Sequence, residues 1–153
     1  MPTKEERKEL RKQKREERKE FKRLRKAKFG DILAAVNYNK IDIDLDQAEP
    51  EFVQAFNQVW PILKPIMEYA ELVKLTGPDA DKAIRAVIQL GDRISTGNAE
   101  EGEEMAFIRI LDTIWQNVKV VLGVVLTFTD GNVDIVINKI IEVGDWITQE
   151  EDI

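Results

Sequence analysis

An internal repeat constrains the fold of this chain more than any other feature. Residues 76–94 align with residues 129–147, and the shared glycine, aspartate and isoleucine pairs include Gly91/Gly144, Asp92/Asp145 and Ile94/Ile147. Upstream, after a two-residue gap, the matching pairs are Phe52/Phe107, Trp60/Trp115 and Lys64/Lys119. The two segments are offset by 53 residues. Self-similarity at such a spacing indicates a supersecondary unit copied in tandem. The sequence therefore predicts two helical hairpins, residues 51–95 and 104–148.

The predicted fold class is all-α. Turn residues separate the expected helices at residues 76–78, 96–98 and 130–132. One hairpin cannot bury the apolar faces of both of its helices, so we expect the two hairpins to pack as a four-helix body over residues 50–148. Two prolines in the first long helix are expected to kink or restart it at Pro61 and Pro65. The repeated tryptophans and glycines are predicted to pack between the repeats: Trp60, Trp115, Gly91 and Gly144.

The N-terminal segment is opposite in charge to the rest of the chain. Residues 1–28 hold 14 Lys/Arg and 6 Glu, whereas the remaining residues hold 9 Lys/Arg and 23 Asp/Glu. Residues 3–28 contain no Gly or Pro and are rich in helix formers, so we expect a basic helical arm over residues 1–29. Four Glu–Lys or Glu–Arg pairs at i,i+3 spacing are expected to support it, at Glu5, Glu9, Glu16 and Glu20. Gly30 and Asp31 are expected to end this helix and cap a short one over residues 32–38.

Two further segments differ from the helical body. Ile41, Ile43 and Leu45 alternate with aspartates, a pattern typical of an extended segment, so residues 30–49 are expected to form an acidic linker or strap. Residues 149–153 are expected to form an acidic tail. Residues 118–128 are apolar on nearly every side, which suits burial in the core, in a subunit interface or in a membrane.

The composition argues against most catalytic and metal chemistry. The chain has no histidine and no cysteine, which removes the commonest general base, the commonest metal ligand and all thiol chemistry. Two acidic clusters, at residues 42–46 and 130–134, lack the glycine and glutamate that a calcium loop requires. We therefore expect no catalytic residue, metal or cofactor. The least favoured hypothesis is an enzyme in which the repeated carboxylates Asp92 and Asp145 share one active site.

The arm is the strongest candidate for a binding site. Its expected partner-binding cations are Arg7, Lys8, Arg11, Lys12, Lys14, Arg15, Arg18, Lys19, Lys22, Arg23, Arg25 and Lys26. We expect a non-enzymatic structural or assembly subunit of a larger complex, such as a virion, whose arm docks on an acidic neighbour, another copy or packaged nucleic acid. The alternative is a nonspecific adaptor for nucleic acid or, less favoured, an anionic membrane surface. No small-molecule substrate is expected. The charged N-terminus is unlike a signal peptide, so the expected location is the cytoplasm or a large particle.

Overall fold

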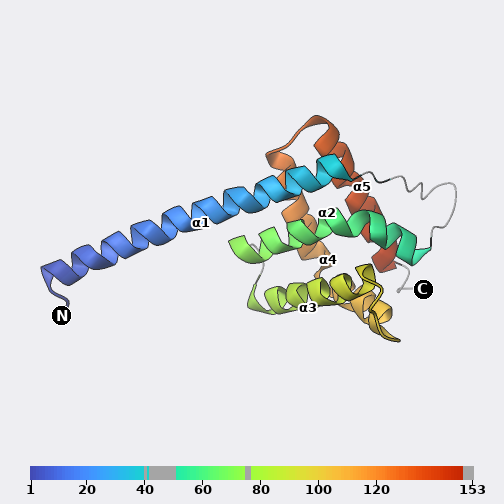
Figure 1. Ribbon diagram of the computed structural model, residues 1–153, viewed down its shortest axis with the longest axis horizontal. Helices are drawn as coiled ribbons and strands as arrows, with labels where there is room; N and C mark the ends of the chain where they lie inside the picture. Colours follow the sequence, from blue (N-terminus) through green and yellow to red (C-terminus); the bar gives the residue numbers. More distant parts are fainter. Residues whose placement is uncertain (40, 42–50, 75–76, 150–153) are drawn as a thin grey trace.

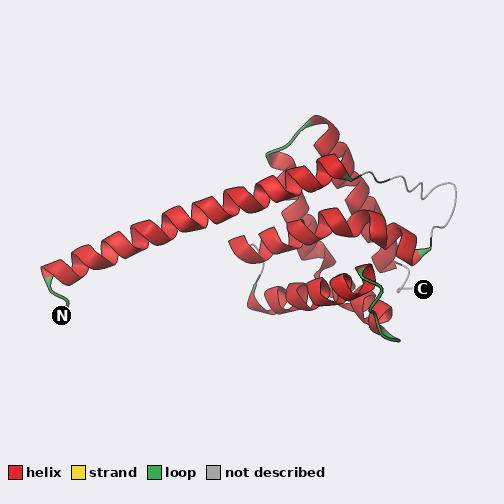
Figure 2. Cartoon of the chain, viewed as in Figure 1, coloured by secondary structure: helices red, strands yellow, loops and turns green. Residues whose placement is uncertain are grey.

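The architecture consists of one long helix laid across a body of four others. The computed structural model describes residues 1–39, 41, 51–74 and 77–149. Its helices are α1 (Lys4–Tyr38), α2 (Phe52–Val73), α3 (Pro78–Ser95), α4 (Glu103–Thr127) and α5 (Gly131–Gln149). Figure 1 shows α1 running beside α2 and projecting beyond the body, and Figure 2 shows helices joined by loops, with no strand in the described residues. The predicted all-helical class is confirmed.

Helix α1 is longer than the sequence predicts. Thr3 starts it with a capping box: its hydroxyl accepts from the Glu6 amide, and the Glu6 carboxylate accepts from the Thr3 amide, each at 3.2 Å. The helix stop expected at Gly30 and the separate helix expected at residues 32–38 are both wrong, because α1 continues to Tyr38. Burial of Ile32 and Val36 against the body stabilises the helix beyond the glycine. The strap expected after it lies outside the described residues, except Ile41, which is half-buried against the core.

Helix α2 runs through both of its prolines without restarting. Each proline lacks the amide that would bond the carbonyl four residues earlier. Those carbonyls belong to Asn57 and Pro61, and both residues are exposed. Water can therefore satisfy the two freed carbonyls while the apolar face of α2 stays packed. The expected restart at Pro61 or Pro65 is wrong.

The core joins α2 to α4 through an aromatic cluster. The rings of Phe56 and Trp60 are stacked with centroids 5.3 Å apart, and Phe107 on α4 meets both edge-on, at 5.3 and 5.8 Å. Edge-to-face pairs of this kind add to the stabilisation from burial alone. Helix α1 closes one side of this core by packing against α2 and α5.

The second half of α4 is apolar on two faces, and the body covers only one. Val118, Val121, Leu122 and Val125 are buried, whereas Val120 is 61% exposed and Phe128, just after the helix, is 71% exposed. By length and composition α4 is also the one helix among the described residues that could cross a membrane, and 39% of its apolar stretch is buried in the body. The apolar segment at residues 118–128 is therefore part of the core on one side and an open apolar surface on the other.

The turn between α3 and α4 is held by the Glu103 carboxylate. This carboxylate accepts a hydrogen bond from the Glu100 amide at 2.8 Å and pairs with Arg93 at 2.7 Å. Both interactions favour the charged form, and the backbone hydrogen bond is the larger cause, so the pKa of Glu103 lies below its ordinary value.

This lowered pKa predicts a pH effect on stability. A carboxylate whose pKa falls on folding stabilises the native state above its unfolded pKa, about 4.3 for glutamate, and that stability is lost as the pH falls through the lowered value. Glu103→Gln should remove this part of the acid sensitivity, as measured by urea unfolding at a series of pH values. Glu104→Gln, at the exposed neighbouring position, is the control. Identical pH dependence in wild type and Glu103→Gln would contradict the assignment.

A candidate docking surface along α1 and at its root

The first part of α1 stands clear of the body. Residues 1–27 are all exposed, and Figure 1 shows this part of the helix extending past the ends of α2 and α3. We call residues 4–27 the overhang. Such a length of helix, roughly 36 Å at 1.5 Å per residue, has no core of its own to bury. Its side chains are therefore available to a partner.

Charge on the overhang is segregated by face. At about 100° per residue, a cation recurs on one side of the helix at every third or fourth position. These cations, which we call the basic face, are Arg7, Arg11, Lys14, Arg18, Lys22 and Arg25. Five of the six glutamates fall on the opposite side: Glu5, Glu6, Glu9, Glu16 and Glu20. The sixth, Glu17, lies at the edge of the basic face, beside Lys14 and Arg18. The other candidate cations flank the basic face on one side: Lys8, Lys12, Arg15, Lys19, Arg23 and Lys26.

The basic face has few neutralising contacts. In the described residues the one ion pair within the overhang joins Glu20 to Arg23, away from the basic face. Its hydrogen bond lowers the pKa of Glu20 and raises that of Arg23. The i,i+3 pairs expected at Glu5, Glu9 and Glu16 are not formed. The basic-face cations thus have no carboxylate partner within the described chain.

The basic face points toward the same side as the body. Following α1 toward its C-terminus, the same helical face carries Phe29, Ile32 and Val36, which pack against the body. Because the periodicity is unbroken through Gly30, the face that is basic on the overhang becomes apolar where the body begins. The overhang and the end of the body form a corner (Figure 1). The helical spacing places the basic face on the inner side of this corner.

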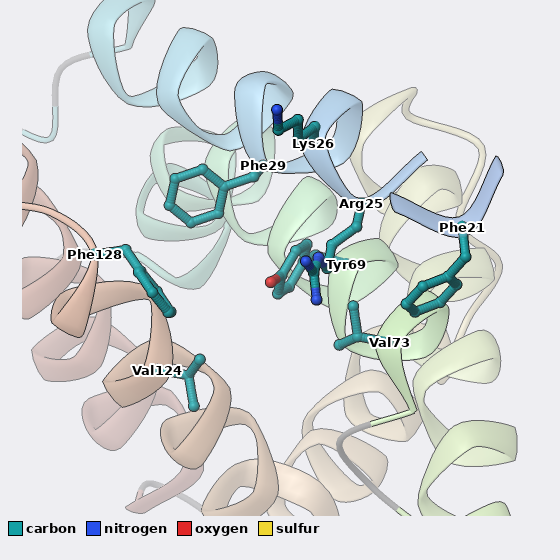
Figure 3. A pocket seen from close by; sticks show the side chains of 8 residues that line it. All are labelled: Phe21, Arg25, Lys26, Phe29, Tyr69, Val73, Val124 and Phe128. Carbon is teal, nitrogen blue, oxygen red and sulfur yellow. The ribbon is translucent and has the colours of Figure 1, made fainter. Parts of the chain in front are cut away.

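A groove lies at the root of the overhang, where α1, α2 and α4 meet. It has a volume of about 510 Å³ and is lined by Phe21, Arg25, Lys26, Phe29, Tyr69, Val73, Val124 and Phe128. Figure 3 shows these side chains around the opening, with Phe29 and Phe128 on one side and Phe21 on the other. Phe29 contacts Tyr69 and Phe128 edge-on, with centroids 6.0 and 6.3 Å apart. None of the lining residues is acidic.

Most residues of the groove were not expected from the sequence. Arg25 and Lys26 belong to the predicted cations, whereas the aromatic and aliphatic members come from three helices far apart in the chain. Helical spacing places Phe21, Arg25 and Phe29 on one side of α1, and this pattern could have flagged the α1 wall. The opposite wall of the groove is formed by residues of α2 and α4 that tertiary packing brings together, so local spacing does not predict it.

The repeated residues form two similar clusters in the body. In one, the Trp60 indole donates to Asp92 at 3.3 Å, and Lys64 pairs with Asp92 at 2.9 Å. In the other, the Trp115 indole donates to Asp145 at 2.6 Å, and Lys119 pairs with Asp145 at 3.1 Å. Asp92 and Asp145 thus sit in separate clusters, each occupied by an indole N–H and an ammonium group, and they do not form a shared site.

The repeated glycines make room for the indoles. A Cβ placed on Gly91 would lie 2.2 Å from the Trp60 ring, and one on Gly144 would lie 1.9 Å from the Trp115 ring. These contacts join α2 to α3 and α4 to α5, so they lie within each predicted hairpin rather than between hairpins. Trp60 also contacts Phe107 on α4, which links the two predicted hairpins.

Metal coordination has no evident location in the part of the chain that is described. No group of three or more Asp, Glu, His or Cys side chains there could hold an ion. Of the two acidic clusters, residues 42–46 lie outside the described residues. In the other, Asp134 accepts a hydrogen bond from the Thr129 hydroxyl at 2.6 Å.

No protein-family model, curated protein or solved structure matches this chain.

Proposed function

We propose that this protein is a non-enzymatic assembly component that docks an acidic partner protein through the basic face of α1. The observation that carries the proposal is the segregation of charge on the overhang. Six cations share one face, no carboxylate of the described chain pairs with them, and all of them are exposed. A one-sided row of cations supports recognition and steering of an anionic surface.

The corner geometry favours a narrow partner over a flat one. The body lies on the side toward which the basic face points, so a membrane surface would meet the body before it reached these cations (Figure 1). A peptide segment or a protein edge can enter the corner. Nucleic acid is the second candidate, because the same cations could neutralise phosphates with steep salt dependence. Aromatic and aliphatic groups at the root of the overhang favour protein, since they offer burial to apolar side chains.

We also propose that the body is a tandem pair of helical hairpins, α2–α3 and α4–α5, to which α1 is an added basic arm. The twin Trp–Lys–Gly–Asp clusters support this, because each joins the long helix of a hairpin to its shorter helix through the same residue types. This body would provide a rigid support for the arm within a larger complex.

Binding to two model polyanions tests the proposed partner class. Full-length protein should bind fluorescent poly-L-glutamate, with an affinity that falls as salt rises from low to physiological strength, where the screening length shrinks to about 8 Å. A duplex DNA of similar charge, measured by the same anisotropy assay, should bind more weakly at matched salt. Failure to bind either polyanion at low salt would contradict the proposal, and tighter binding of DNA would favour the nucleic-acid alternative.

A further inference from the structure

The groove and the basic face are parts of one continuous trough. Two smaller hollows follow the overhang, with volumes of about 200 and 330 Å³. They share Lys14 and Arg18, and the larger one shares Phe21 and Arg25 with the groove of about 510 Å³. The trough therefore extends from Arg11 to the groove, and its outer part is an open surface, because side chains of α1 alone line the two outer hollows. Arg11 and Phe29 are 18 residue steps apart on α1, which makes the trough roughly 27 Å long at 1.5 Å per residue.

The chemistry of the trough changes along its length. The two outer hollows are lined by cations with one carboxylate and one ring among them: Arg11, Lys14, Arg15, Arg18, Lys22 and Arg25, with Glu17 and Phe21. The inner groove has apolar and aromatic walls, and its only charged lining residues are Arg25 and Lys26. An occupant that matches the whole trough carries several negative charges along most of its length and apolar groups at one end.

We propose that the trough binds an acidic peptide segment of a partner protein, with acidic side chains along the overhang and one or two large apolar side chains in the groove. This inference rests on the proposed function and specifies its partner. An extended segment of about eight or nine residues spans the trough at 3.3 Å per residue. A nucleic-acid duplex would match the cations, but its bases are paired and stacked inside it and leave no apolar group for the groove. A single-headed lipid would match the groove but leave most of the cations without partners.

Two synthetic peptides test the inference on the full-length protein. Both carry about eight glutamates, and one ends in Leu-Phe whereas the other ends in Ala-Ala. The wild type should bind the Leu-Phe peptide at least roughly tenfold more tightly, because the groove buries its apolar side chains. Phe21→Ala/Phe128→Ala removes two exposed groove walls, which are 40% and 71% exposed, and should reduce this preference to about twofold without altering the fold.

The outcomes separate this inference from the proposed function. Equal affinity of the wild type for the two peptides would show that the groove does not bury the apolar side chains, and would contradict this inference. The proposed function would survive that result if both peptides lose affinity in Arg11→Glu/Lys14→Glu/Arg18→Glu, and would fail if that variant binds them as the wild type does. If duplex DNA displaces the Leu-Phe peptide at equal charge concentration, the trough is a nucleic-acid site and the inference is wrong. Circular dichroism melting of each variant establishes that the fold is retained.

Discussion

Gly144→Ala is expected to destabilise the protein by about 3 kcal/mol, the upper end of the usual cost of overpacking a core. The new methyl group would lie 1.9 Å from Cζ2 and 2.0 Å from Cη2 of Trp115. The indole cannot move aside freely, because its N–H donates to Asp145 and its ring is 3% exposed. Relief of the clash therefore requires α4 and α5 to separate, which disrupts the packing of the second predicted hairpin.

Gly123→Ala is the matched control for this prediction. Gly144 lies inside α5 and Gly123 inside α4, but a Cβ placed on Gly123 meets no atom within 4 Å. Alanine is a better helix former than glycine, so this change should stabilise the protein by about 0.5–1 kcal/mol. The same substitution in two helical positions thus has opposite expected signs. Urea unfolding, with the slope held constant between variants, measures both.

The same experiment tests the similarity of the two clusters. Gly91→Ala places a methyl group 2.2 Å from the Trp60 ring and should also be strongly destabilising. If Gly144→Ala and Gly91→Ala were as stable as the wild type, the tryptophan rings would not pack directly against the glycines. That result would contradict the proposed similarity of the two clusters.

Charge reversal on the basic face is expected to have the largest effect on binding. Arg11→Glu/Lys14→Glu/Arg18→Glu replaces three neighbouring cations by anions inside the corner, where the acidic partner is proposed to lie. Each reversal both removes an attraction and adds a repulsion, so the loss should reach about 2–3 kcal/mol, or roughly thirty- to a hundredfold in affinity at low salt. All three positions are exposed on α1, and Glu is a good helix former, so the melting temperature should change little.

Salt dependence distinguishes this effect from misfolding. The wild-type affinity for poly-L-glutamate should fall as salt rises, and the reversed variant should show a smaller slope because fewer ion pairs are formed. Unchanged affinity in this variant would show that the basic face does not contact the polyanion.

Local sequence patterns predict the helices of this protein better than its surface. The all-helical class follows from residue propensity and periodicity. The repeated tryptophans and glycines were expected to pack between the repeats, whereas their contacts join α2 to α3 and α4 to α5. The expected break at Gly30 fails because glycine costs only about 1 kcal/mol inside a helix, and burial of Ile32 and Val36 exceeds this cost. The prolines of α2 do not interrupt the helix either. The carbonyls that they leave without an amide donor belong to exposed residues, so water can satisfy them.

The docking surface was only partly predictable. In linear order, glutamates alternate with cations along the overhang, and this pattern argues against a one-signed binding site. On the helix, all of them except Glu17 lie on the side opposite the basic face, and a helical projection could have found this. The alignment of the basic face with the body, and the groove wall contributed by Tyr69, Val73 and Phe128, follow from tertiary packing and have no local signal.

Two variants with equal net charge test the central claim most directly. Arg11→Glu/Lys14→Glu/Arg18→Glu alters the basic face, whereas Lys8→Glu/Lys12→Glu/Lys19→Glu makes the same charge change on its flank. Their affinities for poly-L-glutamate should be measured side by side at one low salt concentration. We expect the basic-face variant to bind at least roughly tenfold more weakly than the flank variant, because its reversed charges lie inside the corner. Equal affinities would mean that only net charge matters, and would contradict a docking surface built on one face of α1.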